Sequence, residues 1–282
     1  MYRRFLSFLL LMFSYTMQAA AETPKAILDT VRLYAMDCGT IMLEARAMNW
    51  FEDTDAYIKT PGIMSVPCFL IRHPRGDLMW DAGLGDKFAG QGVVDLGDGF
   101  SAKVEHSLIG QLKVLQLTSQ DIEFVAFSHH HFDHTGNAAL FKDATYLINR
   151  KEMEWSQHEP FGVDVKTLAF IKDDNTQLIE RDHDLFGDGS VRILRAPGHT
   201  PGHQILMLKL AHAGAVILSG DLYHTRENFC QARVATLNDS RAETLASFDR
   251  VMKFIEKYKA RMVIQHDRED FLGLPKFPEY LD

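Results

Sequence analysis

Residues 128–137, Ser-His-His-His-Phe-Asp-His-Thr-Gly-Asn, are the most informative stretch of this chain. Four histidines and one aspartate fall within six positions, from His129 to His134. Packing alone explains such a run poorly, because imidazoles and a carboxylate crowded into a core need partners or a neutralising charge. A divalent cation supplies that charge, and these side chains are ligands that Zn²⁺ takes in hydrolytic sites.

The residues around this run predict where it lies in the fold. Segment 122–127 is apolar, with β-branched and aromatic members, and is typical of a short buried strand. Residues 138–141 favour a helix. His129 and His131 are two positions apart and can share a face, whereas His130 is expected to point away. The cluster is therefore predicted in a loop between a strand and a helix, where a rigid scaffold positions the ligands.

Residues 1–21 have the three regions of a secretory signal peptide. A positive start is followed by an apolar core at 5–13, which is short for a membrane span, and three alanines offer a cleavage site. We expect cleavage just before Glu22 and export to the periplasm or the medium, with an uncleaved anchor as the alternative.

Residues 22–282 are expected to form one domain, because no linker or change of composition divides them. The formal net charge of the whole chain is −8, and loss of the signal removes two arginines and no acids, which leaves −10. This acidic balance argues against nucleic acid as a partner. No further long apolar stretch predicts contact with a membrane after cleavage, so small molecules are the expected substrates.

The three cysteines, Cys38, Cys68 and Cys230, are too few for a disulfide scaffold. Two could pair in an oxidising compartment, but the sequence leaves the pairing open. None lies in a Cys-x-x-Cys pattern or in a histidine-rich neighbourhood that would activate a thiolate. Neither a thiolate metal site nor a cysteine nucleophile is therefore expected.

Outside the motifs, four segments carry the main structural expectations. Residues 30–36 alternate like an edge strand, and residues 83–100, with six glycines, are expected to be a flexible stretch beside the site. Residues 45–61 are rich in aromatics and have no clear period. They are interpreted as a surface loop that either borders a substrate pocket or packs its aromatics on the body. Residues 240–258 open with Ser-Arg-Ala-Glu, a capping box, and predict the clearest helix.

One design recurs along the chain: a metal-capable side chain directly follows an apolar strand. After the first cluster it appears in Pro-Gly-His at 197–199, Gly-Asp at 220–221 and Gln-His at 265–266. Each later residue alone could be an ordinary turn or surface residue, but together with the first cluster they are expected to converge. Seven ligands are too many for one tetrahedral ion and fit two ions with a bridging carboxylate. The predicted ligands are His129, His131, Asp133, His134, His199, Asp221 and His266.

Two such cations would hold a bridging hydroxide at neutral pH and polarise a substrate carbonyl, so no serine or cysteine nucleophile is needed. The leaving alkoxide would be met by one of the ions or by a proton from Asp133. The residues thus predict a hydrolase with two divalent cations.

These motifs resemble those of the metallo-β-lactamase superfamily, and within it the chain is most similar to the N-acyl homoserine lactonases. The similarity runs from about Val31 to the C-terminus and is carried by residues 128–137, 196–204, 225–229 and 277–280. The resemblance implies an α/β fold, the four-layer αβ/βα sandwich, with two Zn²⁺ ions or other divalent metals between the sheets at one edge. It implies a quorum-quenching enzyme that opens the lactone ring by attack of a metal-bridging hydroxide.

The resemblance also assigns roles. It places His129, His131 and His199 on one ion, Asp133, His134 and His266 on the other, and Asp221 between them, with Asp81 orienting a ligand from behind. These lactonases usually carry a tyrosine three residues after the bridging aspartate, where its hydroxyl can touch the substrate carbonyl.

This chain departs from that pattern, with His224 at the tyrosine position and Tyr223 one residue earlier. Either His224 donates a hydrogen bond through a ring nitrogen, or Tyr223 takes the role from a shifted loop, or the substrate differs. Another lactone, ester or thioester is therefore the alternative substrate. β-Lactams are disfavoured, because β-lactamases usually have a cysteine where Asp221 stands. Acyl-chain preference and a homodimer stay open.

Overall fold

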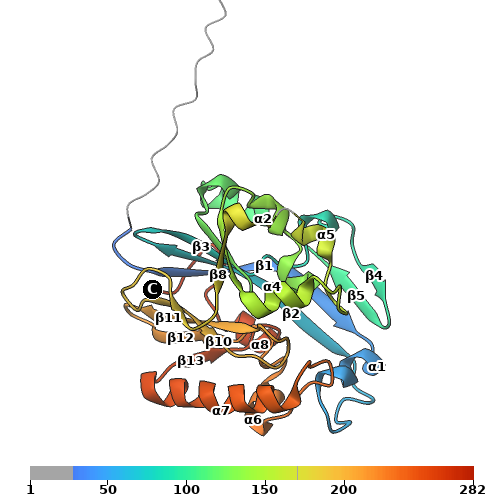
Figure 1. The fold of residues 1–282 in the computed structure, drawn as a ribbon. Helices are drawn as coiled ribbons and strands as arrows, with labels where there is room; N and C mark the ends of the chain where they lie inside the picture. The colour runs from blue at the N-terminus through green and yellow to red at the C-terminus, as the bar shows by residue number, and fades with distance from the viewer. Residues whose placement is uncertain (1–27, 170) are drawn as a thin grey trace, which may run out of the picture.

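The computed structural model describes residues 28–169 and 171–282. The expected signal peptide, residues 1–21, lies outside the described residues, and within them no helix is long and apolar enough to cross a membrane. The described chain forms two β-sheets with helices on both outer sides (Figure 1). The predicted four-layer αβ/βα sandwich is therefore confirmed.

The larger sheet has eight strands in the order β4-β5-β1-β2-β3-β6-β7-β8. Its first part is antiparallel, whereas β3, β6, β7 and β8 run parallel. Parallel strands bring their carboxyl ends to one edge, which is where the loop after β6 begins. The strands are β1 (Arg32–Leu43), β2 (Gly62–His73), β3 (Gly76–Trp80), β4 (Val94–Gly97), β5 (Phe100–Lys103), β6 (Phe124–Ala126), β7 (Thr145–Asn149) and β8 (Thr176–Ile179).

The smaller sheet has five strands in the order β13-β12-β11-β10-β9. Strands β9 to β12 pair antiparallel, and β12 pairs parallel with β13. The carboxyl ends of β12 and β13 therefore point the same way, and each is followed by a predicted ligand. The strands are β9 (His183–Asp184), β10 (Val191–Arg195), β11 (Gln204–Leu210), β12 (Gly214–Leu218) and β13 (Arg261–Val263).

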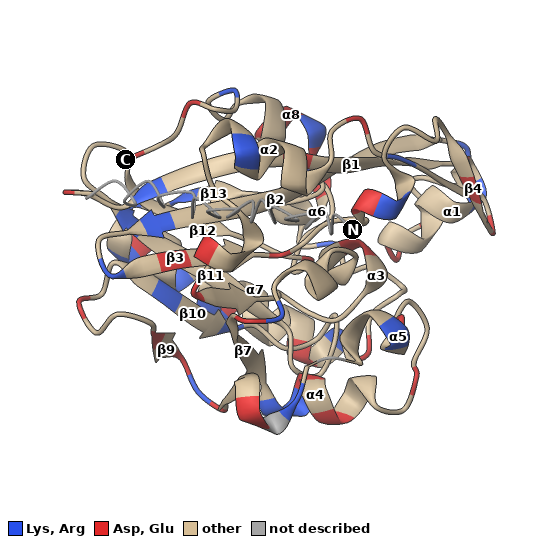
Figure 2. Ribbon diagram, turned by 90° about the horizontal axis from the view of Figure 1, so that it is seen from above, with Lys and Arg blue, Asp and Glu red and all other residues tan. Residues whose placement is uncertain are grey.

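Helices α2 and α4 lie on the outer side of the larger sheet, and α6 and α7 lie on the outer side of the smaller one (Figure 1). Helix α7 begins as predicted after Ser240, whose side chain accepts a hydrogen bond from the backbone N of Glu243. Only this half of the predicted capping box forms, because the Ser240 N–H donates to the backbone oxygen of Gly198. Acidic and basic residues both occur across the described chain (Figure 2). The helices are α1 (Ala45–Met48), α2 (Leu108–Val114), α3 (Phe132–Thr135), α4 (Arg150–Ser156), α5 (Val165–Leu168), α6 (Arg226–Gln231), α7 (Arg241–Tyr258) and α8 (Arg268–Leu272), with 3₁₀ turns η1 (Asn49–Phe51), η2 (Asp86–Phe88), η3 (Ser119–Asp121), η4 (Ala138–Leu140) and η5 (Asp173–Asn175).

Alternate residues of β1 enter two different cores, as the two-residue period of a strand requires. Leu33 and Ala35 pack between the sheets, whereas Tyr34 and Met36 pack in a second cluster that includes residues of α2. A third cluster, around Phe248, lies between the smaller sheet and α7. Full burial of a Leu, Met or Phe side chain contributes about 1.5–3 kcal/mol to the free energy of folding. The three clusters therefore stabilise the sandwich.

Residues 32–36 of β1 pair with β2 along one side and, within the described residues, have only the isolated bridge of Leu33 with Leu281 along the other, as expected of an edge segment, whereas residues 40–43 also pair with β5. Two other expectations about local structure are wrong. Residues 83–100 contain η2 and strand β4, and Gly99 at φ 85° lies in the turn that joins β4 to β5. Residues 138–141 form only the 3₁₀ turn η4.

The structure pairs Cys38 with Cys68, while Cys230 is free and exposed. The bond joins β1 to β2 beside the bulge that shifts their register between Asp37 and Thr40. It ties two neighbouring strands of the larger sheet.

We expect replacement of Cys38 by alanine to lower the free energy of unfolding by about 3–4 kcal/mol, because a bond across 30 positions restricts the unfolded chain. Urea unfolding of the oxidised protein measures the change. Cys230→Ala, the matched control, should leave the midpoint in place. Equal urea midpoints for the wild type, Cys38→Ala and Cys230→Ala would contradict the prediction.

Candidate metal centre

All seven predicted ligands lie at one edge of the two sheets, although they come from four separate segments. The loop after β6 and helix α3 supply His129, His131, Asp133 and His134, the β10–β11 loop supplies His199, and the loops after β12 and β13 supply Asp221 and His266. All except the half-buried His131 are buried. His130 points away, as expected, and its Nδ1 lies 3.0 Å from Ser156 Oγ.

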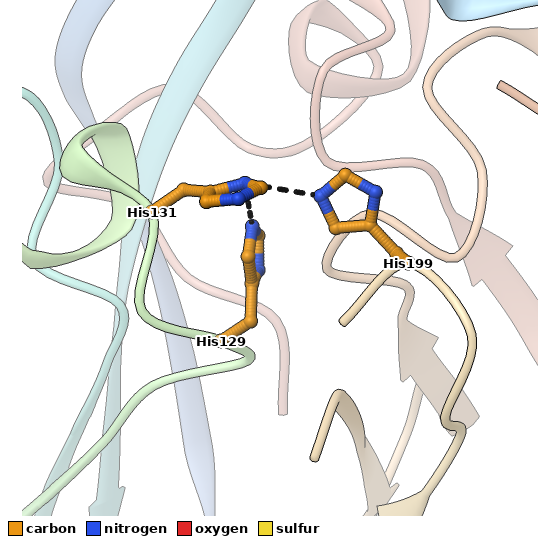
Figure 3. A group of neighbouring side chains, drawn as sticks. All are labelled: His129, His131 and His199. Atoms are coloured by element: carbon orange, nitrogen blue, oxygen red, sulfur yellow. Dashed lines mark hydrogen bonds between the residues drawn. The ribbon is translucent and has the colours of Figure 1, made fainter. Parts of the chain in front are cut away.

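Three imidazoles form what we call the first ligand group (Figure 3). His129 Nε2 lies 2.9 Å from His131 Nδ1, and His199 Nε2 lies 3.1 Å from the same atom. Nitrogens bound to one tetrahedral zinc, at about 2.0–2.1 Å each, are roughly 3.3 Å apart. Two of the three spacings are therefore close to those in a zinc site, and all three ligand atoms lie within 4.8 Å of one another.

Asp133, His134 and His266 form the second ligand group. His134 Nε2 lies 3.2 Å from His266 Nε2, and Asp133 Oδ2 lies 3.8 and 3.6 Å from these two atoms. Asp221 stands between the groups. Its Oδ1 is 3.2 and 3.1 Å from the two imidazoles of the second group, and its Oδ2 is 3.7 and 3.6 Å from two imidazoles of the first. One carboxylate thus serves both groups, as a bridging ligand does.

The ring nitrogens that face away from the groups are held by oxygen atoms. His199 Nδ1 donates to Asn238 Oδ1 over 3.1 Å, and His266 Nδ1 donates to the backbone oxygen of Ser65 over 2.8 Å. Because these oxygens accept, the outward nitrogen carries the proton and the inward Nε2 carries a lone pair. Lone pairs about 3 Å apart repel one another unless a cation lies between them.

A second observation agrees with a cation at this place. Asp221 Oδ1 is buried and has no hydrogen-bond partner within the described residues, although two imidazole nitrogens lie close to it. A buried carboxylate oxygen without a donor is costly unless a metal ion takes the donor's place. The donor set, imidazole nitrogens and carboxylate oxygens, also suits a borderline cation such as Zn²⁺. The residues therefore fit the expected metals.

Burial keeps the imidazoles of the first group neutral, which is the form that binds a metal. It lowers the pKa of His129 and His199 well below the usual value and that of His131 to about 4. Burial opposes a charge on His134 as well, but nearby carboxylates, above all that of Asp221, outweigh it and raise its pKa. The carboxylates therefore stabilise positive charge at the centre.

Asp81 supports the second group from behind, in the place that the resemblance implies. Its Oδ2 accepts from His134 Nδ1 over 3.0 Å and from Gln265 Nε2 over 2.6 Å, and its Oδ1 accepts from the backbone N of Ser128 over 2.6 Å. Sequence reasoning missed Ser128, Gln265 and Asn238 as supporting residues. Ser128 and Gln265 each directly precede a predicted ligand, which could have indicated their roles, whereas Asn238 is 39 positions from His199.

His224 lies in the centre and Tyr223 does not. His224 Nε2 is buried, lies 3.3 Å from Asp221 Oδ2 and has no hydrogen-bond partner within the described residues. Tyr223 instead stacks on Phe248 in the third core cluster, with ring centroids 4.3 Å apart. Of the two candidates that the sequence left open, the geometry therefore favours His224 as the one that can face a substrate.

A cavity of about 690 Å³ opens onto the ligands. Residues 45–61 and 83–100 both border it, through Phe51 and Phe88. Trp50 meanwhile packs its ring on Phe100, so residues 45–61 both border the cavity and pack on the body. The walls are mostly apolar and comprise Ile41, Phe51, Met64, Phe88, Leu96, Phe100, Phe132, Trp155, Phe161 and Leu237.

Comparison with known proteins gives relatives along most of the chain. The profile of the metallo-beta-lactamase superfamily matches residues 61–258. The N-acyl homoserine lactonase AttM of Rhizobium radiobacter is 26% identical over 270 residues, which cover 89% of this chain and 98% of that protein. An N-acyl homoserine lactonase of a Bacillus species is 28% identical over 259 residues, with the same coverage.

Solved structures agree with this relationship. An N-acyl homoserine lactone hydrolase with the product N-hexanoyl-L-homoserine bound at the catalytic metal centre has a TM-score of 0.77 and 25% identity, covering 90% of this chain and 100% of that one. A quorum-quenching N-acyl homoserine lactone hydrolase has a TM-score of 0.76 and 26% identity at the same coverage. With the matched profile spanning more than half of its length, this chain belongs to the metallo-β-lactamase superfamily and is similar to its N-acyl homoserine lactonases.

Proposed function

We propose that this protein is a dinuclear-metal lactonase that opens the lactone ring of N-acyl homoserine lactones by attack of an activated water. The observation that carries the proposal is the pair of ligand groups that share Asp221 beside a largely apolar cavity. The similarity to lactonases along 89% of the chain supports the same substrate class.

In this proposal the first and the second ligand group would each hold one Zn²⁺ ion, and Asp221 would contribute to both. When bound, such a pair activates water at neutral pH and polarises the carbonyl of the substrate. Other divalent metals suit the same donors.

The residues of the chain would divide the remaining work. The apolar walls would bind the acyl chain and exclude water from the ring. Asp133 lines the cavity and would take the proton that the attacking water releases and pass it to the leaving alkoxide. His224 also lines the cavity and would donate a hydrogen bond to the carbonyl oxygen through its unpartnered Nε2.

Mass spectrometry tests the proposal directly. The purified protein is incubated with N-hexanoyl and N-decanoyl homoserine lactone, and the ring-opened acids, heavier by one water, are the expected products. A parallel panel of an aliphatic lactone, an aryl ester and a thioester tests the alternative substrates. Turnover of the panel without turnover of the acyl homoserine lactones would reject the proposed substrate, but not the hydrolytic centre.

We expect His224→Ala to lower kcat/KM on an acyl homoserine lactone by about 10²-fold, as loss of one donor to a developing oxyanion does. The reduction should lie mainly in kcat, because the hydrogen bond strengthens in the transition state. Tyr223→Phe is the matched control and should change kcat/KM less than threefold, since its ring lies in the core. Equal effects of the two substitutions would reject the role of His224.

We also propose that the protein is exported to the periplasm or the medium, where its disulfide would form. The pair Cys38–Cys68 supports this, because disulfides persist mainly in oxidising compartments. Fractionation of cells that produce the full chain, with detection of the mature N-terminus by mass spectrometry, tests export.

A further inference from the structure

Glu152 is a buried carboxylate for which the proposed reaction has no use. It lies in α4, only 2% exposed, outside both ligand groups. Three neutral groups donate to it: the backbone N of His130 to Oε1 over 2.9 Å, and the Thr200 hydroxyl and the backbone N of Gly202 to Oε2 over 2.7 and 3.0 Å. Burying a carboxylate is costly even when it accepts hydrogen bonds. An apolar residue here would leave the three donors without an acceptor, so the carboxylate acts on the segments that carry these donors.

The three donors lie on the two loops that supply the first ligand group. His130 stands between the ligands His129 and His131, and Thr200 directly follows the ligand His199. Glu152 therefore holds with one oxygen the loop after β6 and with the other the β10–β11 loop. The distance between its two oxygens sets how far apart these loops lie near the ligands.

Helix α4 acts as a platform for the same two loops. One helical turn after Glu152, Ser156 Oγ lies 3.0 Å from His130 Nδ1, so the ring of His130 is anchored as well as its backbone. On the other loop, a Cβ added to Gly202 would lie 2.3 Å from the backbone N of Glu152. The loop therefore packs directly on the helix, and only glycine allows this approach.

The second ligand group has different anchors. Asp81, which also accepts from Gln265, accepts from His134 Nδ1, and the backbone oxygen of Ser65 accepts from His266 Nδ1. Glu152 contributes to none of these hydrogen bonds. A change at Glu152 should therefore act on one ligand group only.

We propose that Glu152 is a positioning residue that sets the spacing of His129, His131 and His199 by holding their two loops on α4. The inference rests on the proposed function, in which this group binds one of two divalent cations. Without the carboxylate, the hydrogen bonds from Gln204 to Ser128 and Phe127 still join the loops. The backbone between His129 and His131 and the residue after His199 lose their shared acceptor, and the three nitrogens lose their fixed spacing.

Stepwise metal binding tests the proposal with a readout that is independent of turnover. Metal-free protein is titrated with Zn²⁺ against a chromophoric chelator, and the two dissociation constants are fitted. Glu152→Gln keeps the shape but replaces one acceptor oxygen with an NH₂ group that faces donors. We expect one site to weaken by about 10–100-fold, the usual effect of losing a residue that orients ligands, and the other to stay within threefold of the wild type.

A site-specific assignment comes from nuclear magnetic resonance of the histidine rings in the zinc-loaded protein. In Glu152→Gln at limiting Zn²⁺, resonances of His129, His131 and His199 should revert to their metal-free positions, while those of His134 and His266 stay shifted. Saturating Zn²⁺ should restore the wild-type kcat to Glu152→Gln. A variant that had lost its fold would not recover activity in this way. Thr200→Val, which removes one of the three donors, should weaken the same site by a smaller factor and serves if Glu152→Gln does not fold.

Tyr146→Phe is the control for a merely structural effect, because it removes hydrogen bonds to Ala138 and Phe141 from the core behind the site. It should lower the unfolding midpoint without changing either dissociation constant. Glu152 has no positioning role if both variants show the two dissociation constants of the wild type. The same holds if both constants rise by the same factor. If the wild type itself binds no divalent cation, it is the proposed function that fails.

Discussion

Replacing Asp221 by asparagine is expected to lower kcat/KM on an acyl homoserine lactone by about 10³-fold or more. Asp221 is the carboxylate that faces both ligand groups, and an amide keeps its shape but removes the negative charge and one ligand oxygen. A cation pair contributes several kcal/mol of transition-state stabilisation, and each 1.4 kcal/mol is worth about tenfold in rate.

Metal analysis of the purified variant separates the causes of this loss. We expect Asp221→Asn to retain fewer than two zinc ions per chain, since the remaining donors of each group lack the shared charge. Asp98→Asn is the matched control, because Asp98 lines the same cavity but belongs to neither ligand group. It should change activity less than threefold. Full activity of Asp221→Asn with both metals bound would show that the shared carboxylate is dispensable.

Removal of divalent metal is expected to abolish lactone hydrolysis and to lower the thermal midpoint of the protein. Without a cation, Asp221 is neutralised by the imidazoles of His134 and His266, whose pKa values it raises against the effect of burial, and these two rings then repel each other across 3.2 Å. A site that is filled at 1,000 times its dissociation constant adds about 4 kcal/mol to the stability of the folded state. For a chain of this size the midpoint should fall by roughly 10 °C per site lost.

Dialysis against a chelator followed by differential scanning calorimetry measures this change. Added Zn²⁺ should restore both activity and midpoint, whereas Mg²⁺, which prefers oxygen ligands, should not. The second group contains one carboxylate beside two imidazoles, so Mn²⁺ is expected to restore part of the activity. Undiminished hydrolysis by protein that contains no metal would remove the basis of the proposed mechanism.

Local features of the centre could be predicted from the sequence because they depend on short segments. The histidine run follows a buried strand, and its two-residue period turns His130 away from its neighbours, as the structure confirms. Cap chemistry likewise placed the start of α7 at Ser240. The recurrence of a ligand after three later strands indicated that distant segments meet.

Other features depend on partners that are distant in sequence. Nothing near Cys38 indicates that Cys68, rather than Cys230, is its partner, because that choice follows from the register of β1 and β2. The glycine-rich residues 83–100 form a strand only because β5 offers its edge for pairing.

By itself the sequence determined the ligand types, their order and their placement after strands, since periodicity and turn chemistry act within a few residues. Only the tertiary structure decided that Asp221 lies between two ligand groups, that His224 and not Tyr223 faces the cavity, and that Glu152 holds two loops. These outcomes are distances between side chains on different segments, and the packing of the two sheets and their helices fixes such distances.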